Sequence, residues 1–164
     1  FMRPPALAAD DTPMLSVLLH ALDWYEAKGI SLETVILLQP TSPFRTGSHI
    51  DDVIKLFRLH KPSSVVSVME VPHSFNPVSV LKITDNILHP YLESTEQFSR
   101  RQDKPPAYAR NGPAILMVSA QTLRSGELYG KHSIPYLMRA EDSLDIDTPG
   151  DLEYAQWLMQ KKKQ

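Results

Sequence analysis

Two aspartates near the C-terminal end of the chain, Asp145 and Asp147, are separated by one residue. In an extended backbone alternate side chains share a face, so both carboxylates could converge on one cation while Ile146 faces the core. Mg²⁺ commonly takes one or two protein carboxylates and leaves its other positions to water and substrate phosphates. The pair therefore indicates nucleotide chemistry with Mg²⁺ as the cofactor. A solvated acidic turn remains the alternative on this pattern alone, because Asp-x-Asp is short and common.

The segments on either side of the two aspartates decide how they are presented. Residues 134–138 have the apolar character of a strand, and residues 149–162 predict a helix that Thr148 caps and Pro149 begins. We therefore expect the carboxylates at the mouth of a strand, immediately before a helix N-terminus.

The chain before this region alternates between helix and strand signals. Apolar residues recur at three- and four-residue steps over 11–28 and again over 48–60, which predicts two amphipathic helices. Residues 34–39 and 63–71 are apolar runs of the kind found in strands covered on both faces. This alternation predicts an α/β fold with a parallel or mixed sheet between layers of helices.

Residues from about 71 to 110 leave this alternation. Alternate apolar residues predict a strand at 78–83 and residues 84–86 predict its hairpin turn, whereas regularity fades over 89–111. Aromatic and apolar side chains persist there, so we expect an ordered excursion from the sheet whose apolar residues need cover. A strand at 114–118 and a short helix directly after it resume the alternation.

Composition limits the classes of function. With 164 residues, 42% of them hydrophobic and 22% charged, the chain is long enough for one domain with a sizeable core. A formal net charge of −2 at pH 7 argues against a broad basic face for nucleic acid. Cysteine is absent, which excludes thiolate nucleophiles and cysteine-ligated zinc within these residues. No apolar run approaches the roughly 18 residues of a membrane helix, so we expect no membrane span and a cytoplasmic protein.

Further polar side chains stand where ligands commonly bind. Gln39 ends the first expected strand, and its amide could contact a pyrimidine edge, although a capping role is the alternative. Arg100 and Arg101 place two guanidinium groups in one loop, which suits carboxylate and phosphate, although a solvated basic turn has the same composition. Asn111 and the glycine after it indicate, in the first place, a turn.

Together these segments resemble one family. The motifs are Leu-Gln-Pro-Thr-Ser-Pro-Phe-Arg at 38–45, Arg-Arg-Gln-Asp at 100–103, Ala-Arg-Asn-Gly at 109–112 and the aspartate pair. In order and approximate spacing they are similar to those of the acylneuraminate cytidylyltransferases, the CMP-sialic acid synthetases. The resemblance covers nearly all of the chain. It implies a three-layer nucleotidyltransferase fold with a mixed, mostly parallel sheet, and a small dimerisation insertion at about 71–110 in a homodimer.

The resemblance also implies an activity and roles for individual residues. The activity is the Mg²⁺-dependent transfer of CMP from CTP to a sialic-acid-type keto-sugar acid, with release of pyrophosphate. Asp145 and Asp147 would bind the catalytic Mg²⁺, Gln39 would contact the nucleotide base, and Arg3 would contact its phosphates. Arg101, Gln102 and Asn111 would bind the sugar. Of these, Arg101 would reach it from the neighbouring subunit.

The chain departs from the family at its N-terminal end. Family members begin with a strand and a Gly-rich, basic loop that wraps the triphosphate, whereas this chain opens at Phe1 and contains no such loop. Such a loop supplies backbone N–H donors and a lysine to the phosphates. We therefore expect residues 1–164 to be an N-terminally incomplete cytidylyltransferase-like domain that is inactive on its own.

Other interpretations compete with this one. A related keto-sugar acid, such as a pseudaminic, legionaminic or octulosonic acid, would fit the same motifs. A non-catalytic, dimerising sugar-binding remnant would fit the missing loop. Residues 144–148 also match the Asp-x-Asp-x-Thr nucleophile loop of haloacid-dehalogenase-type phosphatases. Chain order rejects that last alternative, because only residues 149–164 follow, too few for the α/β domain that comes after such a loop.

Overall fold

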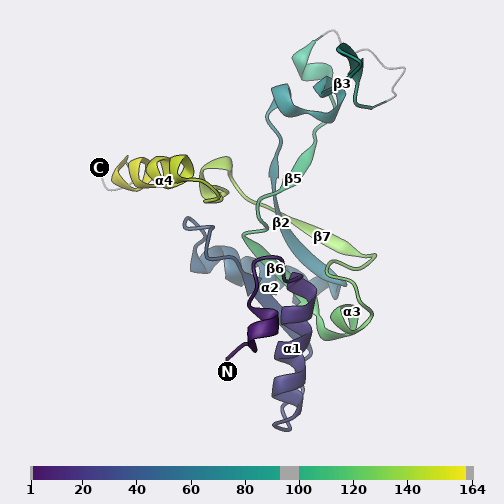
Figure 1. The fold of residues 1–164 in the computed structure, drawn as a ribbon, viewed down its shortest axis with the longest axis vertical. Helices are drawn as coiled ribbons and strands as arrows, with labels where there is room; N and C mark the ends of the chain where they lie inside the picture. The colour runs from purple at the N-terminus through teal and green to yellow at the C-terminus, as the bar shows by residue number, and fades with distance from the viewer. Residues whose placement is uncertain (1, 93–99, 162–164) are drawn as a thin grey trace.

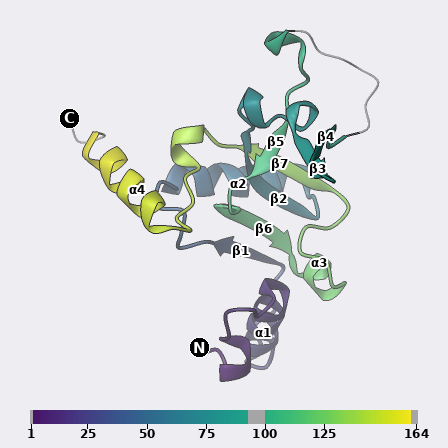
Figure 2. The ribbon, with the colours of Figure 1, turned by 45° about the horizontal axis from the view of Figure 1, so that its top comes forward.

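The computed structural model describes residues 2–92 and 100–161, and within them the centre of the molecule is a five-stranded sheet. Figures 1 and 2 show the sheet between helix α1 on one side and helix α2 on the other. Its strands are β1 (Thr34–Leu38), β2 (Ser64–Glu70), β5 (Tyr108–Arg110), β6 (Ile115–Ser119) and β7 (Ser133–Leu137). Short 3-10 helices occur at Pro5–Leu7, His73–Phe75, Pro77–Ser79, Arg101–Asp103 and Ala140–Asp142.

The sheet is mixed, as expected, but the prediction that it is mostly parallel is wrong for the described strands. β6 lies between β1 and β2 and runs antiparallel to both, and β5 is also antiparallel to β2. The β2–β7 pair is parallel. An apolar run shows that a strand is covered on both faces, but it carries no information about the direction of its neighbours. The placement of β6 between β1 and β2 depends on long-range contacts, which the local sequence pattern does not reveal.

This topology gives β1, β2 and β7 one common direction. β1 and β2 are each antiparallel to β6, and β7 is parallel to β2. The C-terminal ends of these strands and the N-terminal end of β6 therefore meet at one edge of the sheet. In α/β sheets this is the edge where ligands bind.

Helices cover the two faces of the sheet and form two core clusters. Consecutive residues of β2 point to opposite faces, so Val66 packs with α1 (Met14–Glu26) and α3 (Ala120–Arg124), whereas Val65 packs with α2 (Gly47–His60). The expected helices and strands are thereby confirmed, with ends shifted by a few residues. The buried residues of the first cluster are Leu18, Leu22, Val66, Leu116, Val118 and Leu123, and those of the second are Val53, Val65, Ile115 and Met117.

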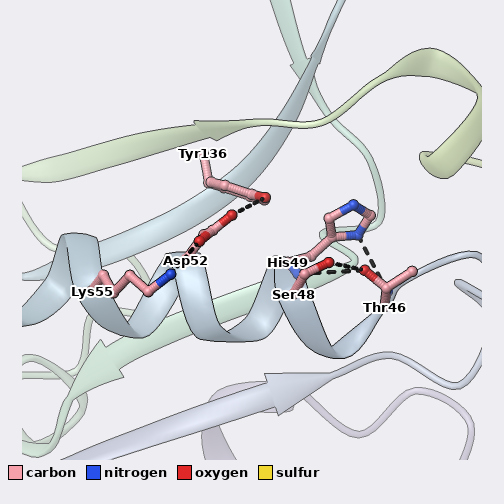
Figure 3. A network of polar contacts seen from close by, with 6 residues as sticks. All are labelled: Thr46, Ser48, His49, Asp52, Lys55 and Tyr136. Carbon is pink, nitrogen blue, oxygen red and sulfur yellow. Dashed lines mark hydrogen bonds and ion pairs between the residues drawn. The ribbon is translucent and has the colours of Figure 1, made fainter.

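Helix α2 is fixed at its start by a capping box. The Thr46 hydroxyl accepts a hydrogen bond from the His49 amide, and the Thr46 amide donates to His49 Nδ1 at 3.2 Å. Farther along the helix, Tyr136 Oη of β7 donates to Asp52 Oδ2 at 3.5 Å, and Lys55 pairs with the same carboxylate at 2.9 Å (Figure 3). The Lys55 ammonium lowers the pKa of Asp52. These contacts align α2 with the last strand of the sheet.

Residues 71–92 and 100–107 form an arm that extends away from the sheet at the upper end of Figure 1. It carries a separate antiparallel hairpin of β3 (Leu81–Thr84) and β4 (Ile87–Pro90). The hairpin turn is confirmed where the sequence predicts it, with positive φ angles of 52° at Asp85 and 62° at Asn86. At the base of the arm, Asn76 Nδ2 donates to the Pro105 carbonyl at 2.8 Å.

Helix α4 (Pro149–Lys161) extends from the opposite side of the sheet from α3 in Figure 1. Its predicted cap is confirmed, because Thr148 Oγ1 accepts from the Asp151 amide at 3.3 Å while Asp151 Oδ2 accepts from the Thr148 amide at 2.8 Å. Its most buried residue is Ala155, at 3% exposure. None of the helices in the described ranges is both long and apolar enough to span a membrane.

Candidate functional site

Three motif segments meet at the edge of the sheet where β1, β2 and β7 end. Gln39 and the turn after it follow β1, residues 111–114 lead into β6, and the aspartate pair approaches from beyond β7. The Ile146 amide donates to the Thr41 carbonyl at 2.9 Å, so the aspartate segment lies directly beside the turn that follows β1. The structure therefore places these motif segments at one edge of the sheet.

The aspartates are presented differently from the sequence expectation. They do not stand at the mouth of a strand, because β7 ends at Leu137 and a 3-10 helix at Ala140–Asp142 intervenes. Residues 143–147 have no regular secondary structure. Their position is therefore set by hydrogen bonds to neighbouring segments, not by a strand.

Asp145 is the more enclosed of the two carboxylates. Its Oδ1 atom is buried and has no hydrogen-bond partner among the described residues. A Cβ built on Gly112 would lie 3.0 Å from Asp145 Oδ2, so the glycine leaves the space that this carboxylate occupies. A buried carboxylate oxygen without a donor is costly unless a ligand satisfies it. Asp145 therefore has the surroundings of a cation or ligand contact.

Asp147 is exposed, and its backbone amide donates to Asp151 Oδ2 at 3.2 Å. Among the residues that the structure describes, no group of three or more acidic or histidine side chains is arranged to hold a metal ion. Two carboxylates are nevertheless enough for Mg²⁺ when water and phosphate oxygens complete the shell. The donor set therefore fits Mg²⁺ that is shared with a phosphate ligand.

Arg45 proves to be an internal anchor. Its Nη1 atom donates to the Gln39 carbonyl at 2.9 Å and to the Ala114 carbonyl at 2.7 Å. Partial burial lowers the pKa of this guanidinium from its ordinary value. The side chain therefore ties the end of β1 to the start of β6.

Asn111 is 4% exposed, and its amide is fully engaged within the protein. Its Oδ1 accepts from Ser67 Oγ at 2.7 Å and from the Ala114 amide at 3.3 Å. Its Nδ2 donates to Ser143 Oγ at 3.0 Å and contacts Met138 Sδ at 3.4 Å. A hydrogen bond from this amide to a sugar, as the resemblance implied, has no free donor or acceptor in this arrangement.

The other expected site residues lie at this edge, in the arm, before α1 or outside the described parts. Arg3 is exposed and precedes α1. Gln102 is exposed in a 3-10 helix of the arm, and the side chain of Arg101, in the same helix, lies outside the described structure. Gln39 is half-buried at the end of β1. The structure thus brings Gln39, Asn111, Asp145 and Asp147 to one edge, whereas Gln102 lies in the arm.

Sequence reasoning missed several residues that build the site. Ser67 and Ser143 are buried serines in unremarkable surroundings, and neither belongs to a recognised motif. Ser42 does belong to one, and its hydroxyl is buried without a hydrogen-bond partner among the described residues. A serine within an otherwise apolar strand, as at position 67, is the one signal that the sequence offered.

A hollow of about 620 Å³ lies at the opposite end of the sheet, where β1 and β2 begin. Its lining includes Glu33, Lys61 and Lys131, all of which are exposed. It contains none of the motif residues. We therefore place the functional site at the other edge, with the enclosed carboxylate.

Several known proteins are similar to this chain in sequence. No family model matches the chain. It is 32% identical over 162 residues to an N-acylneuraminate cytidylyltransferase of Escherichia coli O18:K1:H7, covering 98% of this chain and 37% of that protein. A protein of the same name from Streptococcus agalactiae serotype V is 30% identical over 150 residues, covering 92% of this chain and 35% of that protein. The chain therefore spans about a third of the length of these relatives.

Two further relatives have different names. A CMP-N,N'-diacetyllegionaminic acid synthase of Legionella pneumophila is 28% identical over 163 residues, covering 98% of this chain and 68% of that protein. Among solved structures, CMP:2-keto-3-deoxy-manno-octonic acid synthetase complexed with CTP superimposes with a TM-score of 0.60 at 12% identity, over 93% of this chain and 70% of that chain. This likeness shows that the fold is that of the nucleotidyltransferases. In sequence, the chain is similar over nearly its whole length to N-acylneuraminate cytidylyltransferases.

Proposed function

We propose that the protein carrying this chain transfers CMP from CTP to a keto-sugar acid of the sialic acid type and releases pyrophosphate. The observation that supports this most directly is the buried, unpartnered Oδ1 of Asp145, at the edge where three motif segments meet. A carboxylate in such surroundings suits a cation that a substrate phosphate also binds. The relatives named above supply the class of reaction.

In this proposal Asp145 and Asp147 hold Mg²⁺, which would neutralise charge on the α-phosphate of CTP. The anomeric hydroxyl oxygen attacks the α-phosphorus, the bond to pyrophosphate breaks, and the hydroxyl proton is released. Gln39 contacts the base, and its place at the end of β1 is held through its carbonyl by Arg45. Arg3 would contact the phosphates, and Arg101 and Gln102 would contact the sugar from a neighbouring subunit.

We propose a homodimer in which the arm forms the contact. Its apolar side chains are exposed on one chain: Phe75 by 69%, Ile83 by 73%, Leu88 by 62% and Tyr91 by 61%. A cluster of this kind marks an interaction surface more often than single exposed residues do. An arm crossing to a partner would also carry Arg101 and Gln102, which lie in it, toward the other subunit. Since the reaction consumes CTP, we propose that the protein works in the cytoplasm.

The choice among sugar acids is tested by measuring pyrophosphate release. The complete product of the gene that encodes this chain is incubated with CTP, Mg²⁺ and, in turn, N-acetylneuraminic acid, a legionaminic acid and an octulosonic acid. We expect the sialic acid to react fastest, because two relatives that are 32% and 30% identical to the chain are N-acylneuraminate cytidylyltransferases. A clear preference for either of the other two acids would move the assignment to that substrate.

The metal role is tested by Asp147→Asn in the same assay. Removal of a metal ligand is expected to lower the rate about a hundredfold or more. Asp51→Asn, at an exposed position on α2, is the matched control and should leave the rate unchanged. Normal transfer by Asp147→Asn at saturating Mg²⁺ would refute this role. The 164-residue chain alone, which contains no Gly-rich phosphate loop, is expected to be inactive.

A further inference from the structure

A continuous relay of hydrogen bonds connects the middle of β2 to the segment that carries Asp145. Ser67 Oγ donates to Asn111 Oδ1 at 2.7 Å, and Asn111 Nδ2 donates to Ser143 Oγ at 3.0 Å. Ser143 Oγ donates in turn to the Arg139 carbonyl at 2.8 Å. All three side chains of this Ser67–Asn111–Ser143 relay are buried. The relay ends two residues before Asp145.

We propose that Asn111 and Ser143 are positioning residues that fix the Asp145 carboxylate for Mg²⁺ binding, and that Asn111 is not a sugar ligand. This inference rests on the proposed function for the identity of the metal. It concerns two side chains for which neither the fold nor the relatives provide a role of this kind.

The first step of the argument is the saturation of the Asn111 amide. Its oxygen receives two donors, Ser67 Oγ and the Ala114 amide, and its nitrogen has two neighbours, Ser143 Oγ and Met138 Sδ. A side-chain amide offers two acceptor sites and two donor hydrogens, so none remains for a ligand. Turning the amide toward a sugar would leave buried partners unsatisfied, which is costly.

The second step is the way in which the Asp145 segment is held. Residues 143–147 have no strand or helix pairing, so their place depends on individual hydrogen bonds. Two hydrogen bonds tie the segment to distant parts of the fold, one before Asp145, from Asn111 to Ser143, and one after it, from the Ile146 amide to the Thr41 carbonyl at 2.9 Å. Its other bonds, from Ser143 to residues 139 and 140 and from the Asp147 amide to Asp151, are local. Asp145 thus lies between two long-range contacts, and loss of the first would leave only local bonds on that side of it.

The third step is the close fit between Asp145 and the turn that Asn111 begins. A Cβ on Gly112 would lie 3.0 Å from Asp145 Oδ2. The Asn111 side chain holds this turn through its bond with the Ala114 amide at 3.3 Å. The same amide therefore sets both the surface against which the carboxylate lies and the segment that carries it. Outer hydrogen bonds that orient metal ligands commonly affect metal affinity.

The test measures metal binding directly. Mn²⁺, used in place of Mg²⁺, is titrated into the complete gene product with and without CTP, and free Mn²⁺ is followed by electron paramagnetic resonance. The variants are Asp145→Asn, Ser143→Ala, Asn111→Ala and the double variant of the last two positions. Ser64→Ala is the matched control. Ser64 is a fully buried serine on the same strand as Ser67, and its hydroxyl contacts the Tyr129 carbonyl at 2.5 Å and Ser133 Oγ at 2.7 Å, at the far end of β2.

Asp145→Asn should remove the Mn²⁺ site, and Ser143→Ala should weaken Mn²⁺ binding about tenfold, at the lower end of what outer hydrogen bonds contribute. The double variant should bind Mn²⁺ no more weakly than Asn111→Ala does, because Ser143→Ala and Asn111→Ala break the same hydrogen bond. Ser64→Ala should bind Mn²⁺ as the unmodified protein does. In turnover at saturating metal, the KM for the sugar acid should remain unchanged in Ser143→Ala and Asn111→Ala.

Three results would overturn the proposal. Unchanged Mn²⁺ affinity in Ser143→Ala, with a raised sugar KM in Asn111→Ala, would make Asn111 a sugar ligand. Equal losses of Mn²⁺ affinity in Ser143→Ala and Ser64→Ala would mean that the relay contributes only to general stability. A protein without any Asp145-dependent Mn²⁺ site would have nothing for the relay to position. Since the titration needs no turnover, failure of cytidylyl transfer alone would refute the proposed function and leave this test intact.

Discussion

Replacement of Arg45 by methionine tests whether the site edge is held together by one guanidinium. Methionine keeps an unbranched, largely apolar side chain but has no N–H group. The substitution removes the donor that reaches the Gln39 carbonyl at 2.9 Å and the Ala114 carbonyl at 2.7 Å. These carbonyls belong to the end of β1 and the residue before β6, so the two ends lose a direct connection.

The magnitude follows from the two hydrogen bonds. Hydrogen bonds to a charged group contribute about 1.5–3 kcal/mol each when buried. Arg45 is only half-buried, so water can replace part of each bond. We therefore expect a loss of about 2–3 kcal/mol in the free energy of unfolding. For a domain of this size that corresponds to a fall in Tm of about 4–12 °C.

The assay is equilibrium unfolding in urea, read by circular dichroism, with the slope compared between variants to confirm that the same surface unfolds. Arg139→Met is the matched control, because the Arg139 side chain is 79% exposed and pairs with Glu141 at the surface. It should change stability by less than about 1 kcal/mol. Arg45→Lys should fall between the two. Equal midpoints for Arg45→Met and Arg139→Met would refute the anchoring role.

Three further predictions concern other parts of the chain. Gly112→Ala forces a φ of +112° and a Cβ 3.0 Å from Asp145 Oδ2, so it should lower the free energy of unfolding in urea by about 1–2 kcal/mol or more. Hydrogen bonds from the Thr148 hydroxyl and amide lower the pKa of Asp151. Its stabilising contribution is therefore present above the ordinary carboxyl pKa and is lost as the pH falls through the lowered value. In acid titrations followed by circular dichroism, Asp151→Asn should lack this acid-dependent part, and an unchanged profile would contradict the prediction. Ile83→Asp should shift sedimentation from dimer to monomer, whereas Leu59→Asp, at a residue 75% exposed on α2, should not; equal behaviour of the two would count against the arm as the interface.

The types and places of the elements could be predicted from local pattern. The three- and four-residue apolar steps of α1 and α2 specify a helix, and Thr148 with Pro149 specifies the start of α4. The turn at Asp85 and Asn86 is equally local, since both residue types tolerate a positive φ. Each of these features depends on interactions within a few residues of the chain, which is why the sequence alone reveals them.

The roles of Arg45 and Asn111 could not be predicted in this way. Arg45 bonds to Ala114, 69 positions away, and Asn111 bonds to Ser67, 44 positions away. An arginine or asparagine in a motif fits a ligand contact and an internal anchor equally well, because the same donors serve both. The position of Asp145 depends on the same distant contacts. The prediction of strand direction failed for a related reason, because β6 pairs with β1 and β2, which are distant from it along the chain.

The distribution of unsatisfied groups is a separate argument for where the function lies. Ser64, Ser67, Asn76, Asn111, Thr122 and Ser143 are all buried and all hydrogen-bonded within the protein. Ser42 Oγ and Asp145 Oδ1 are buried without partners among the described residues, and they flank the single bond between Thr41 and Ile146. An unsatisfied buried group typically costs about 1–3 kcal/mol. Sequences that are otherwise well satisfied tend to accept such a cost at functional sites. A ligand that supplies a cation to Asp145 and a polar group to Ser42 would offset both costs at once, as Mg²⁺ bound together with a phosphate-bearing or carboxylate-bearing substrate can.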